Sequence, residues 1–340
     1  MFTSLLEKLV RHEDLTTEEA AAAMGEVMKG RATPASLAGL LSALVMKGER
    51  PPEIVGFAQA MREHSVKLAA PPGDVFDTCG TGGDRSGTFN ISSAAALVVA
   101  AAGVKVAKHG NRSVSSRCGS ADVFEQLGVN IAAPAPVVER SLHDSNIAFF
   151  FAQTFHPSMK HAAPIRKELG IRTAFNLLGP LTNPAGARRQ IIGVPRPELG
   201  DLLARALLML GTERAWVVHG LDGIDEISTT GYTKVLECRD GAITSFYIHP
   251  AEFGLPKAAA GDLQGGDAVH NAAMISDVLS GKKGAPRDVV LLNAGAALLV
   301  AGRVKNMREG IARAAEAIDS GAARATLDAM ARASHGSATV

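Results

Sequence analysis

The sequence predicts an α/β protein made of a small all-helical domain and a larger domain in which helices cover a mainly parallel sheet. Residues up to about 70 show only helical patterns, whereas later residues alternate between short apolar strands and helices. In that later part, a glycine-rich turn stands between an apolar lead-in and a long apolar run, as expected for a strand, a turn and a buried helix. The change of pattern coincides with a linker at residues 69–73, Ala-Ala-Pro-Pro-Gly.

The predicted helices of the first part have recognisable starts. Thr16-Thr-Glu-Glu19 is a capping box, and Thr33-Pro34 puts a threonine before a helix and a proline at its first position. Pro52 begins a third helix. The wide apolar faces of these helices need a partner, which is either a helical subdomain or the surface of a symmetric dimer. We expect a homodimer through the N-terminal helices.

The second part alternates between strands and helices, and such repeated units predict a mainly parallel sheet. The predicted strands are 104–108, 147–152, 215–219, 235–238 and 243–248. The predicted helices are 94–102, 121–127, 157–170, 197–210 and several Ala/Leu-rich helices from about residue 270. Asp240-Gly241 separates the last two strands and predicts a hairpin turn.

Composition restricts the class of protein. The chain has 340 residues, of which 46% are hydrophobic and 20% charged, as in a globular protein with room for two domains. Its net charge of +1 gives no overall field for nucleic acid or an anionic membrane. Three cysteines without metal spacing are typical of a reducing cytoplasm, and we expect neither a signal peptide nor a bilayer-spanning run of about 18 apolar residues.

The glycine turn is the first candidate site. The segment Asp77-Thr-Cys-Gly-Thr-Gly-Gly-Asp84 lacks the spacing of a dinucleotide fingerprint and the Gly-Lys-Ser/Thr of a P-loop, so a purely structural turn is the alternative. The helix that follows begins with more hydroxyl and amide groups than capping needs, namely Thr88, Asn90, Ser92 and Ser93. These groups favour a phosphorylated ligand, and Asp84 inside the turn indicates a cation, for which Mg²⁺ is the candidate.

A basic loop follows the strand that ends at residue 108. Lys108, Arg112 and Arg117 supply positive charge with no acidic residue between them, and several serines add hydroxyl groups. An exposed basic loop is the alternative, but this density of phosphate-type donors at a strand end favours a ligand site. His109 is either an acid/base group or a residue that positions the substrate.

An acidic loop follows the strand that ends at His219. Asp222, Asp225 and Glu226 lie among glycines, which also describes an ordinary solvated turn. The adjacent pair Asp225-Glu226 at the end of a strand suits a hard cation. Together with the basic loop, this pair suits a substrate that consists of Mg²⁺ and pyrophosphate. Arg166 belongs to a predicted basic helix. The sequence pattern alone does not distinguish Arg166 from the basic residues of an ordinary solvated helix face.

Several ordered motifs resemble those of the anthranilate phosphoribosyltransferases, tryptophan-pathway enzymes with a nucleoside-phosphorylase-like fold. The resemblance extends from the N-terminal helices to about residue 330. The motifs are Cys79-Gly-Thr-Gly-Gly-Asp84, Thr88-Phe-Asn-Ile-Ser92, Lys108-His-Gly-Asn-Arg112, Ser120-Ala-Asp122, Arg172-Thr-Ala-Phe-Asn-Leu-Leu-Gly-Pro-Leu-Thr-Asn-Pro184 and Asp225-Glu-Ile-Ser228.

The resemblance implies that the amine of anthranilate attacks C1 of 5-phosphoribosyl-1-pyrophosphate and expels pyrophosphate. It also implies a discontinuous helical domain, residues 1–70 with a returning segment at about 156–190, which carries a dimer contact. Residues 74–155 and 191–340 would then form the α/β domain that binds 5-phosphoribosyl-1-pyrophosphate, and anthranilate would enter at the hinge. Nucleic acid and membrane partners are not expected.

Site residues follow from the same resemblance. The phosphoribosyl pyrophosphate ligands would be Gly80, Gly83, Asp84, Thr88, Asn90, Ile91, Ser92, Ser93, Lys108, His109, Gly110, Asn111, Arg112, Ser113, Val114, Ser115, Ser116 and Ser120. The anthranilate ligands would be Gly80, Asn111 and Arg166, with Arg166 facing the carboxylate and His109 near the ring. The Mg²⁺ ligands would be Ser92, Asp225 and Glu226, while Asp84 would order the turn or meet the metal through water.

The chain departs from the family pattern in small ways, and two other functions remain as alternatives. Ser93 stands where threonine is expected, Arg117 where lysine is frequent, and Cys118 at a position for a small residue. A pyrimidine nucleoside phosphorylase shares the architecture but has a differently spaced lysine–serine glycine loop. A non-catalytic homologue that binds nucleic acid would need a basic surface and a damaged site.

Overall fold

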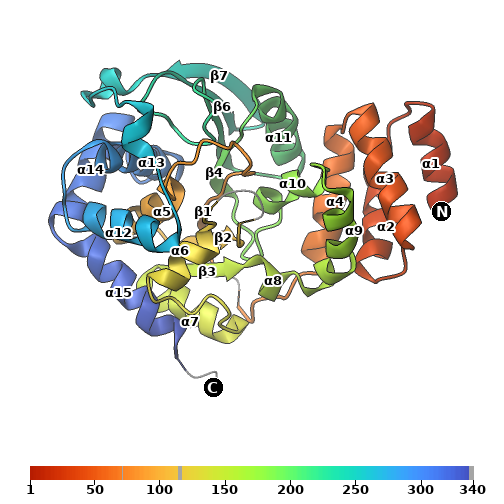
Figure 1. Ribbon diagram of the computed structural model, residues 1–340, viewed down its shortest axis with the longest axis horizontal. Helices are drawn as coiled ribbons and strands as arrows, with labels where there is room; N and C mark the ends of the chain where they lie inside the picture. Colours follow the sequence, from red (N-terminus) through yellow and green to blue (C-terminus); the bar gives the residue numbers. More distant parts are fainter. Residues whose placement is uncertain (71, 114–116, 337–340) are drawn as a thin grey trace.

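The protein divides into a helical end and a larger sheet-containing body (Figure 1). A computed structural model describes residues 1–70, 72–113 and 117–336. The helical end consists of α1 (Phe2–Val10), α2 (Thr17–Met28), α3 (Pro34–Lys47) and α4 (Pro51–Glu63). The predicted capping box is present at α2, where Thr16 Oγ1 accepts from the Glu19 amide and Glu19 accepts from the Thr16 amide.

The sheet has seven strands in the order β3-β2-β1-β4-β5-β6-β7. The strands are β1 (Phe76–Thr78), β2 (Val106–Gly110), β3 (Ile147–Phe151), β4 (Arg189–Gly193), β5 (Arg214–Gly220), β6 (Thr233–Arg239) and β7 (Ala242–Ile248). All pairs from β3 to β5 are parallel, and β6 and β7 add an antiparallel hairpin. This confirms the predicted fold class of a mainly parallel sheet covered by helices.

The order of the strands creates a switch point between β1 and β4. The chain runs from β1 outward to β2 and β3, and then returns to the other side of β1 to build β4 and β5. The connections that leave the carboxyl ends of β1 and β4 therefore run in opposite directions, which is the place where open α/β sheets bind ligands. The glycine turn follows β1 directly, so the fold places it at this position.

Helices cover both faces of the sheet. One face packs against a core that joins α5, α13 and the C-terminal helices, and the other packs against α11 and the helical end. The longer helices of this body are α5 (Ile91–Ala101), α7 (Ala135–Ser145), α11 (Pro197–Met209), α12 (Ala268–Leu279), α13 (Ala285–Val300), α14 (Met307–Asp319) and α15 (Ala322–Ser334). The shorter ones are α6 (Ser120–Gln126), α8 (Ala152–Phe155), α9 (Ala163–Leu169) and α10 (Phe175–Leu178).

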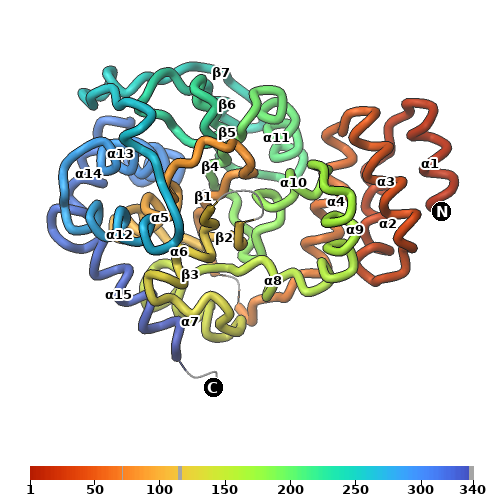
Figure 2. Tube along the Cα trace, viewed as in Figure 1, coloured from red at the N-terminus to blue at the C-terminus, as the bar shows by residue number. Residues whose placement is uncertain are grey.

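The chain returns to the helical end between β3 and β4. Figure 2 shows α9 and α10 beside the N-terminal helices, and Ala162, Phe175 and Leu178 share a hydrophobic core with α2, α3 and α4. The predicted helix 157–170 is in fact a 3₁₀ helix, Pro157–His161, followed by α9. Pro164 explains this break, because it lacks an amide hydrogen and its ring crowds the preceding turn.

The sequence prediction lacked β4, α7 and the short helices α8 and α10. The hairpin prediction was right, because Asp240 and Gly241 both have positive φ, as this kind of turn requires.

None of the helices within the described ranges is long and apolar enough to cross a bilayer.

Candidate functional site

The glycine turn is anchored to both central strands. Its first residues bond to β4, with the Cys79 amide 3.2 Å from the Ile191 carbonyl oxygen and the Thr81 amide 2.9 Å from that of Gly193. Burial raises the pKa of the Cys79 thiol to about 12, so this cysteine is protonated at neutral pH and is no nucleophile. The turn therefore acts through its backbone and its flanking polar groups.

Asp225 lies against this turn from the acidic loop. Its Oδ2 accepts from the Gly82 amide at 3.0 Å. A Cβ on Gly80 would stand only 2.6 Å from the same oxygen, which explains why a glycine is needed at that position. Asp84 lies close enough to Asp225 to raise its pKa. The turn and the acidic loop, which are far apart in the sequence, thus form one site.

Burial and neighbouring carboxylates disfavour the charged form of the acidic pair. Burial first, and then Asp84, raises the pKa of Asp225 to about 7, and burial with Asp225 raises that of Glu226 to about 8. Crowded carboxylates of this kind favour a bound cation. Across the described ranges, no group of three or more histidine, cysteine, aspartate or glutamate side chains is arranged as a metal cage. A cation that needs only one or two carboxylates, plus water and substrate oxygens, fits this donor set.

Glu226 meets the N-terminus of α5. Its Oε1 accepts from the Ser92 amide at 3.0 Å, where the positive end of the helix dipole favours an anion. Asn90, the N-cap residue, is fixed by α12, because Asn271 Nδ2 donates to its Oδ1 at 2.9 Å. Ser93 is buried, and its hydroxyl has no hydrogen-bond partner within the described part of the chain.

Protein groups already engage two basic residues of the basic loop, Lys108 and Arg112. Lys108 is 2% exposed and its Nζ donates to the Thr78 carbonyl, so it points inward between β1 and β2. Arg112 is engaged by Asp122 and Glu125, each at 2.8 Å. Asp122 also accepts from the amides of Ser113, at 3.1 Å, and Gly119, at 2.8 Å, and so holds both ends of the loop.

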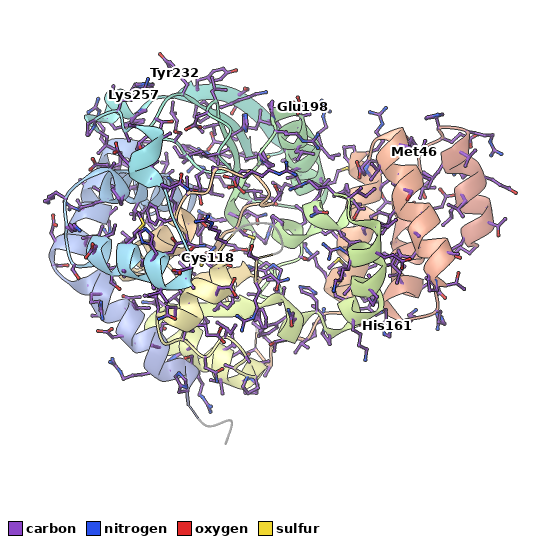
Figure 3. All side chains as sticks on the ribbon, viewed as in Figure 1. Met46, Cys118, His161, Glu198, Tyr232 and Lys257 are labelled. Carbon is purple, nitrogen blue, oxygen red and sulfur yellow. The ribbon has the colours of Figure 1, made fainter. Side chains whose placement is uncertain are left out.

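The remaining residues predicted for phosphate binding have varied surroundings. Val114, Ser115 and Ser116 lie outside the described residues. Ile91 is fully buried, and its amide donates to the Phe89 carbonyl oxygen at 2.7 Å. Thr88 forms an isolated bridge with Gln264, and Ser120 donates to the Asn111 carbonyl at 3.5 Å beside Gly110. Cys118, labelled in Figure 3, lies in the interior beside α6 and α12.

Two buried histidines lie beside the turn. The ring centroids of His109 and His156 are 5.3 Å apart. Burial lowers the pKa of His109 to about 4 and that of His156 to about 3, so both rings are neutral at pH 7. His109 Nδ1 lies 2.9 Å from the Gly179 carbonyl, which places the proton on Nδ1 and leaves Nε2 as an acceptor.

The returning segment contributes two arginines. The Arg166 guanidinium lies over the Phe175 ring, 5.0 Å from its centroid, and no ion pair or side-chain hydrogen bond engages it among the residues described here. Arg172 reaches from the same segment to the glycine turn, where its Nη1 donates to the Gly82 carbonyl at 2.8 Å.

Unsatisfied polar atoms gather around these elements. Within the described ranges, eight buried side-chain polar atoms have no hydrogen-bond partner. Six of them belong to the glycine turn, the start of α5, the two histidines or the returning segment, namely Thr81, Ser93, His109, His156, Arg172 and Thr173. Because buried polar groups are ordinarily paired, this concentration marks a place where a polar ligand completes the hydrogen bonding.

Three residues of the site have no role in the sequence-based prediction. His156 carries no local motif, and Arg172 begins one of the quoted motifs but was given no role there; the fold brings both to the turn. Asp122 lies in a quoted motif, and an acid three residues after Gly119 is a capping signal that could have been recognised. The site as a whole combines an anion-binding turn, a carboxylate pair that needs a cation and a free arginine, which together suit an anionic, metal-associated substrate.

Comparison with known proteins places this site in a class. The sequence model of the glycosyl transferase family a/b domain matches residues 72–324, and that of the family's helical bundle domain matches residues 3–65. The chain is 52% identical over 330 residues to the anthranilate phosphoribosyltransferase of Moorella thermoacetica, covering 97% of each chain. It is 49% identical over 338 residues to that of Methanosphaerula palustris, covering 99% of each.

Solved structures agree with the sequence relatives. The anthranilate phosphoribosyltransferase of Thermus thermophilus has a TM-score of 0.90 at 43% identity, covering 97% of this chain and 99% of its own. The Saccharomyces cerevisiae enzyme in complex with PRPP and Mg has a TM-score of 0.88 at 29% identity, covering 98% and 97%. This chain therefore belongs to the anthranilate phosphoribosyltransferase family.

Proposed function

We propose that this protein transfers the phosphoribosyl group of 5-phosphoribosyl-1-pyrophosphate to the amine of anthranilate, a step of L-tryptophan biosynthesis. The bond from C1 to the pyrophosphate oxygen breaks, a bond from C1 to the amine nitrogen forms, and the amine gives up one proton. The products are N-(5-phosphoribosyl)anthranilate and pyrophosphate. The observation that carries the proposal is the contact of Asp225 with Gly82 at the switch point, which joins a carboxylate pair to a phosphate-type turn.

Mg²⁺ is the proposed cofactor. The crowded Asp225 and Glu226, with Ser92 beside Glu226, would hold it together with substrate oxygens and water, and Asp84 would support the cluster. When bound, the ion would neutralise charge on the departing pyrophosphate. Support also comes from a relative, since the yeast enzyme has been solved with PRPP and Mg.

The turn, the start of α5 and the loop after β2 would bind the phosphoribosyl pyrophosphate. We assign to this role the residues inferred from the sequence, namely Gly80, Gly83, Asp84, Thr88, Asn90, Ile91, Ser92, Ser93, Lys108, His109, Gly110, Asn111, Arg112, Ser113, Val114, Ser115, Ser116 and Ser120. Lys108 and Arg112 are held by protein groups, so they would act by shaping the loop or by changing partners when the substrate binds.

Anthranilate would lie between the returning segment and the turn. Arg166 has the free guanidinium that a carboxylate requires, and Gly80 and Asn111 would line the approach. His109 Nε2 is a free acceptor, so it would orient the amine by accepting one of its hydrogens. A ring with a pKa of about 4 is a weak base, and a neutral aryl amine needs no prior deprotonation, so positioning is the larger part of this role.

The proposed domains, assembly and compartment follow from the same features. Residues 1–70 and about 156–190 would form the helical domain, because Phe175 and Leu178 share the core of its helices, and residues 74–155 and 191–340 would form the other domain. A homodimer would use the N-terminal helices, where Met46, labelled in Figure 3, is 83% exposed. The three free cysteines suit the cytoplasm.

The test is the loss of anthranilate fluorescence when the purified protein receives 5-phosphoribosyl-1-pyrophosphate and Mg²⁺. We expect loss only when all three components are present. Cleavage of thymidine by phosphate without anthranilate consumption would instead support a nucleoside phosphorylase. Salt-sensitive DNA binding without any transfer would support the nucleic-acid-binding alternative.

A further inference from the structure

Arg172 connects the returning segment to the glycine turn. It lies between α9 and α10, and its Nη1 donates to the Gly82 carbonyl oxygen at 2.8 Å. Among the residues that the structure describes, this is the hydrogen bond that joins segment 156–190 to residues 79–90. The segment that carries Arg166 is thereby linked to the turn that carries the phosphate-type amides.

The turn is built around the Arg172 guanidinium. Gly83 has φ +80°, and a Cβ at this residue would stand only 1.8 Å from Arg172 Nη1. The guanidinium therefore occupies the space that any side chain at position 83 would need. A glycine is required here both for the left-handed backbone and for this close approach.

The Gly82 residue is held from two sides. Its carbonyl accepts from Arg172, and its amide donates to Asp225 Oδ2 at 3.0 Å. A cation on the returning segment, the turn and one member of the carboxylate pair thus form a continuous chain of hydrogen bonds. A displacement of Arg172 would change how the turn faces Asp225.

The other terminal nitrogen of Arg172, Nη2, lacks a partner among the residues that the structure describes. Nη2 is buried, and no hydrogen-bond acceptor reaches it within the described part of the chain. Burial lowers the pKa of Arg172, and the nearby charges of Arg196 and Arg85 lower it further, although Asp225 partly offsets them. A guanidinium stays protonated at neutral pH, so this donor and these charges call for an oxyanion.

We propose that Arg172 Nη2 binds an oxygen of the pyrophosphate group of 5-phosphoribosyl-1-pyrophosphate while Nη1 holds the turn. This inference rests on the proposed function. A phosphate suits the position better than the anthranilate carboxylate, because Arg196 and Arg85 lie close enough to add to the positive charge at Arg172 and the phosphorylated substrate carries several negative charges. The single carboxylate has its own free partner in Arg166.

The experiment compares Arg172→Ala and Arg172→Lys with the wild type and with a matched control, Arg62→Ala. Arg62 Nε donates to the Leu181 carbonyl at 2.7 Å, so this control also removes a guanidinium-to-carbonyl bond to the returning segment, but one that does not involve the turn. Each protein is measured for both KM values, for kcat, for its melting temperature and for calorimetric binding of magnesium pyrophosphate without anthranilate.

If Arg172→Ala removes a charge-assisted hydrogen bond to the bound substrate, the kinetic and binding constants should change in a distinct way. Arg172→Ala should raise the KM for 5-phosphoribosyl-1-pyrophosphate and the Kd for pyrophosphate at least tenfold, with the anthranilate KM within threefold of wild type. Arg172→Lys should recover part of the pyrophosphate affinity because it keeps the charge. Arg62→Ala should lower the melting temperature and leave both KM values near those of wild type.

Two results would overturn the inference. One is unchanged pyrophosphate affinity in both Arg172 variants, and the other is a rise in the anthranilate KM alone. If Arg172→Ala does not fold, Arg172→Lys decides, because a single ammonium cannot reproduce both guanidinium contacts. Absence of transfer by the wild type would refute the proposed function instead, and pyrophosphate calorimetry would still test Arg172.

Discussion

Gly80→Ala tests the contact between the glycine turn and Asp225. The added Cβ would stand 2.6 Å from Asp225 Oδ2 and 3.2 Å from its Cγ. Cβ contacts under 3.0 Å essentially never occur, so the carboxylate or the turn must move by at least about 0.4 Å. Rotation of the carboxylate would strain its bond to the Gly82 amide, and movement of the turn would displace the phosphate-type amides. Both responses change the site rather than the core.

The size of the effect follows from the sensitivity of catalysis to position. A misplacement of about 1 Å can cost on the order of 100-fold, so we expect kcat/KM to fall between about 10-fold and 100-fold, or about 1.4 to 2.7 kcal/mol. The measurement is anthranilate fluorescence at several Mg²⁺ concentrations, with the melting temperature recorded alongside. Gly231→Ala is the matched control, because a Cβ there meets nothing within 4 Å. Activity of Gly80→Ala within twofold of wild type would refute the reasoning.

Three other predictions concern the arginine, the carboxylate pair and the histidines. Arg166→Ala should raise the anthranilate KM at least tenfold because it removes the carboxylate partner, and a rise confined to the other substrate would contradict this role. Asp225→Asn with Glu226→Gln should lower kcat and raise the Mg²⁺ concentration needed for half-maximal rate, whereas an unchanged metal titration would exclude the pair as ligands. The lowered pKa values of His109 and His156, about 4 and about 3 against an ordinary 6.5, mean that the unfolded chain binds more protons between pH 6.5 and 4. The free energy of unfolding should therefore fall as pH falls through that range, by about 3 kcal/mol for His109 alone. The melting temperature, plotted against pH for the wild type and for the variant with glutamine at both histidine positions, should give two curves that converge toward low pH. Parallel curves would show that the histidines do not contribute.

The fold could be predicted from local signals wherever those signals were complete. The capping box at Thr16, the helix start at Pro34 and the turn at Asp240-Gly241 each specify backbone geometry within a few residues, and the structure has all three. β4 was not predicted because two of its five residues, Arg189 and Gln190, are polar and leave only a short apolar run. The predicted helix 157–170 is divided at Pro164, because a proline inside a helical pattern ends the helix. This break could have been predicted from the sequence.

The site was predictable only where its residues form motifs along the chain. The turn at residues 77–84 and the pair Asp225-Glu226 are such motifs, and the sheet brings them together at the switch point. His156 and Arg172 act through their place in space, since each is separated by more than forty residues in the chain from its partner in the site. The engagement of Arg112 by Asp122 and Glu125 likewise depends on how α6 folds back onto its loop.

The central claim is that this site joins anthranilate to a phosphoribosyl group. Its most direct measurement is a single assay that follows anthranilate fluorescence and released pyrophosphate together in the presence of 5-phosphoribosyl-1-pyrophosphate and Mg²⁺. One pyrophosphate should appear for each anthranilate consumed, and chelation of the metal should stop both signals. Release of pyrophosphate without loss of anthranilate, or no change in either signal, would contradict it.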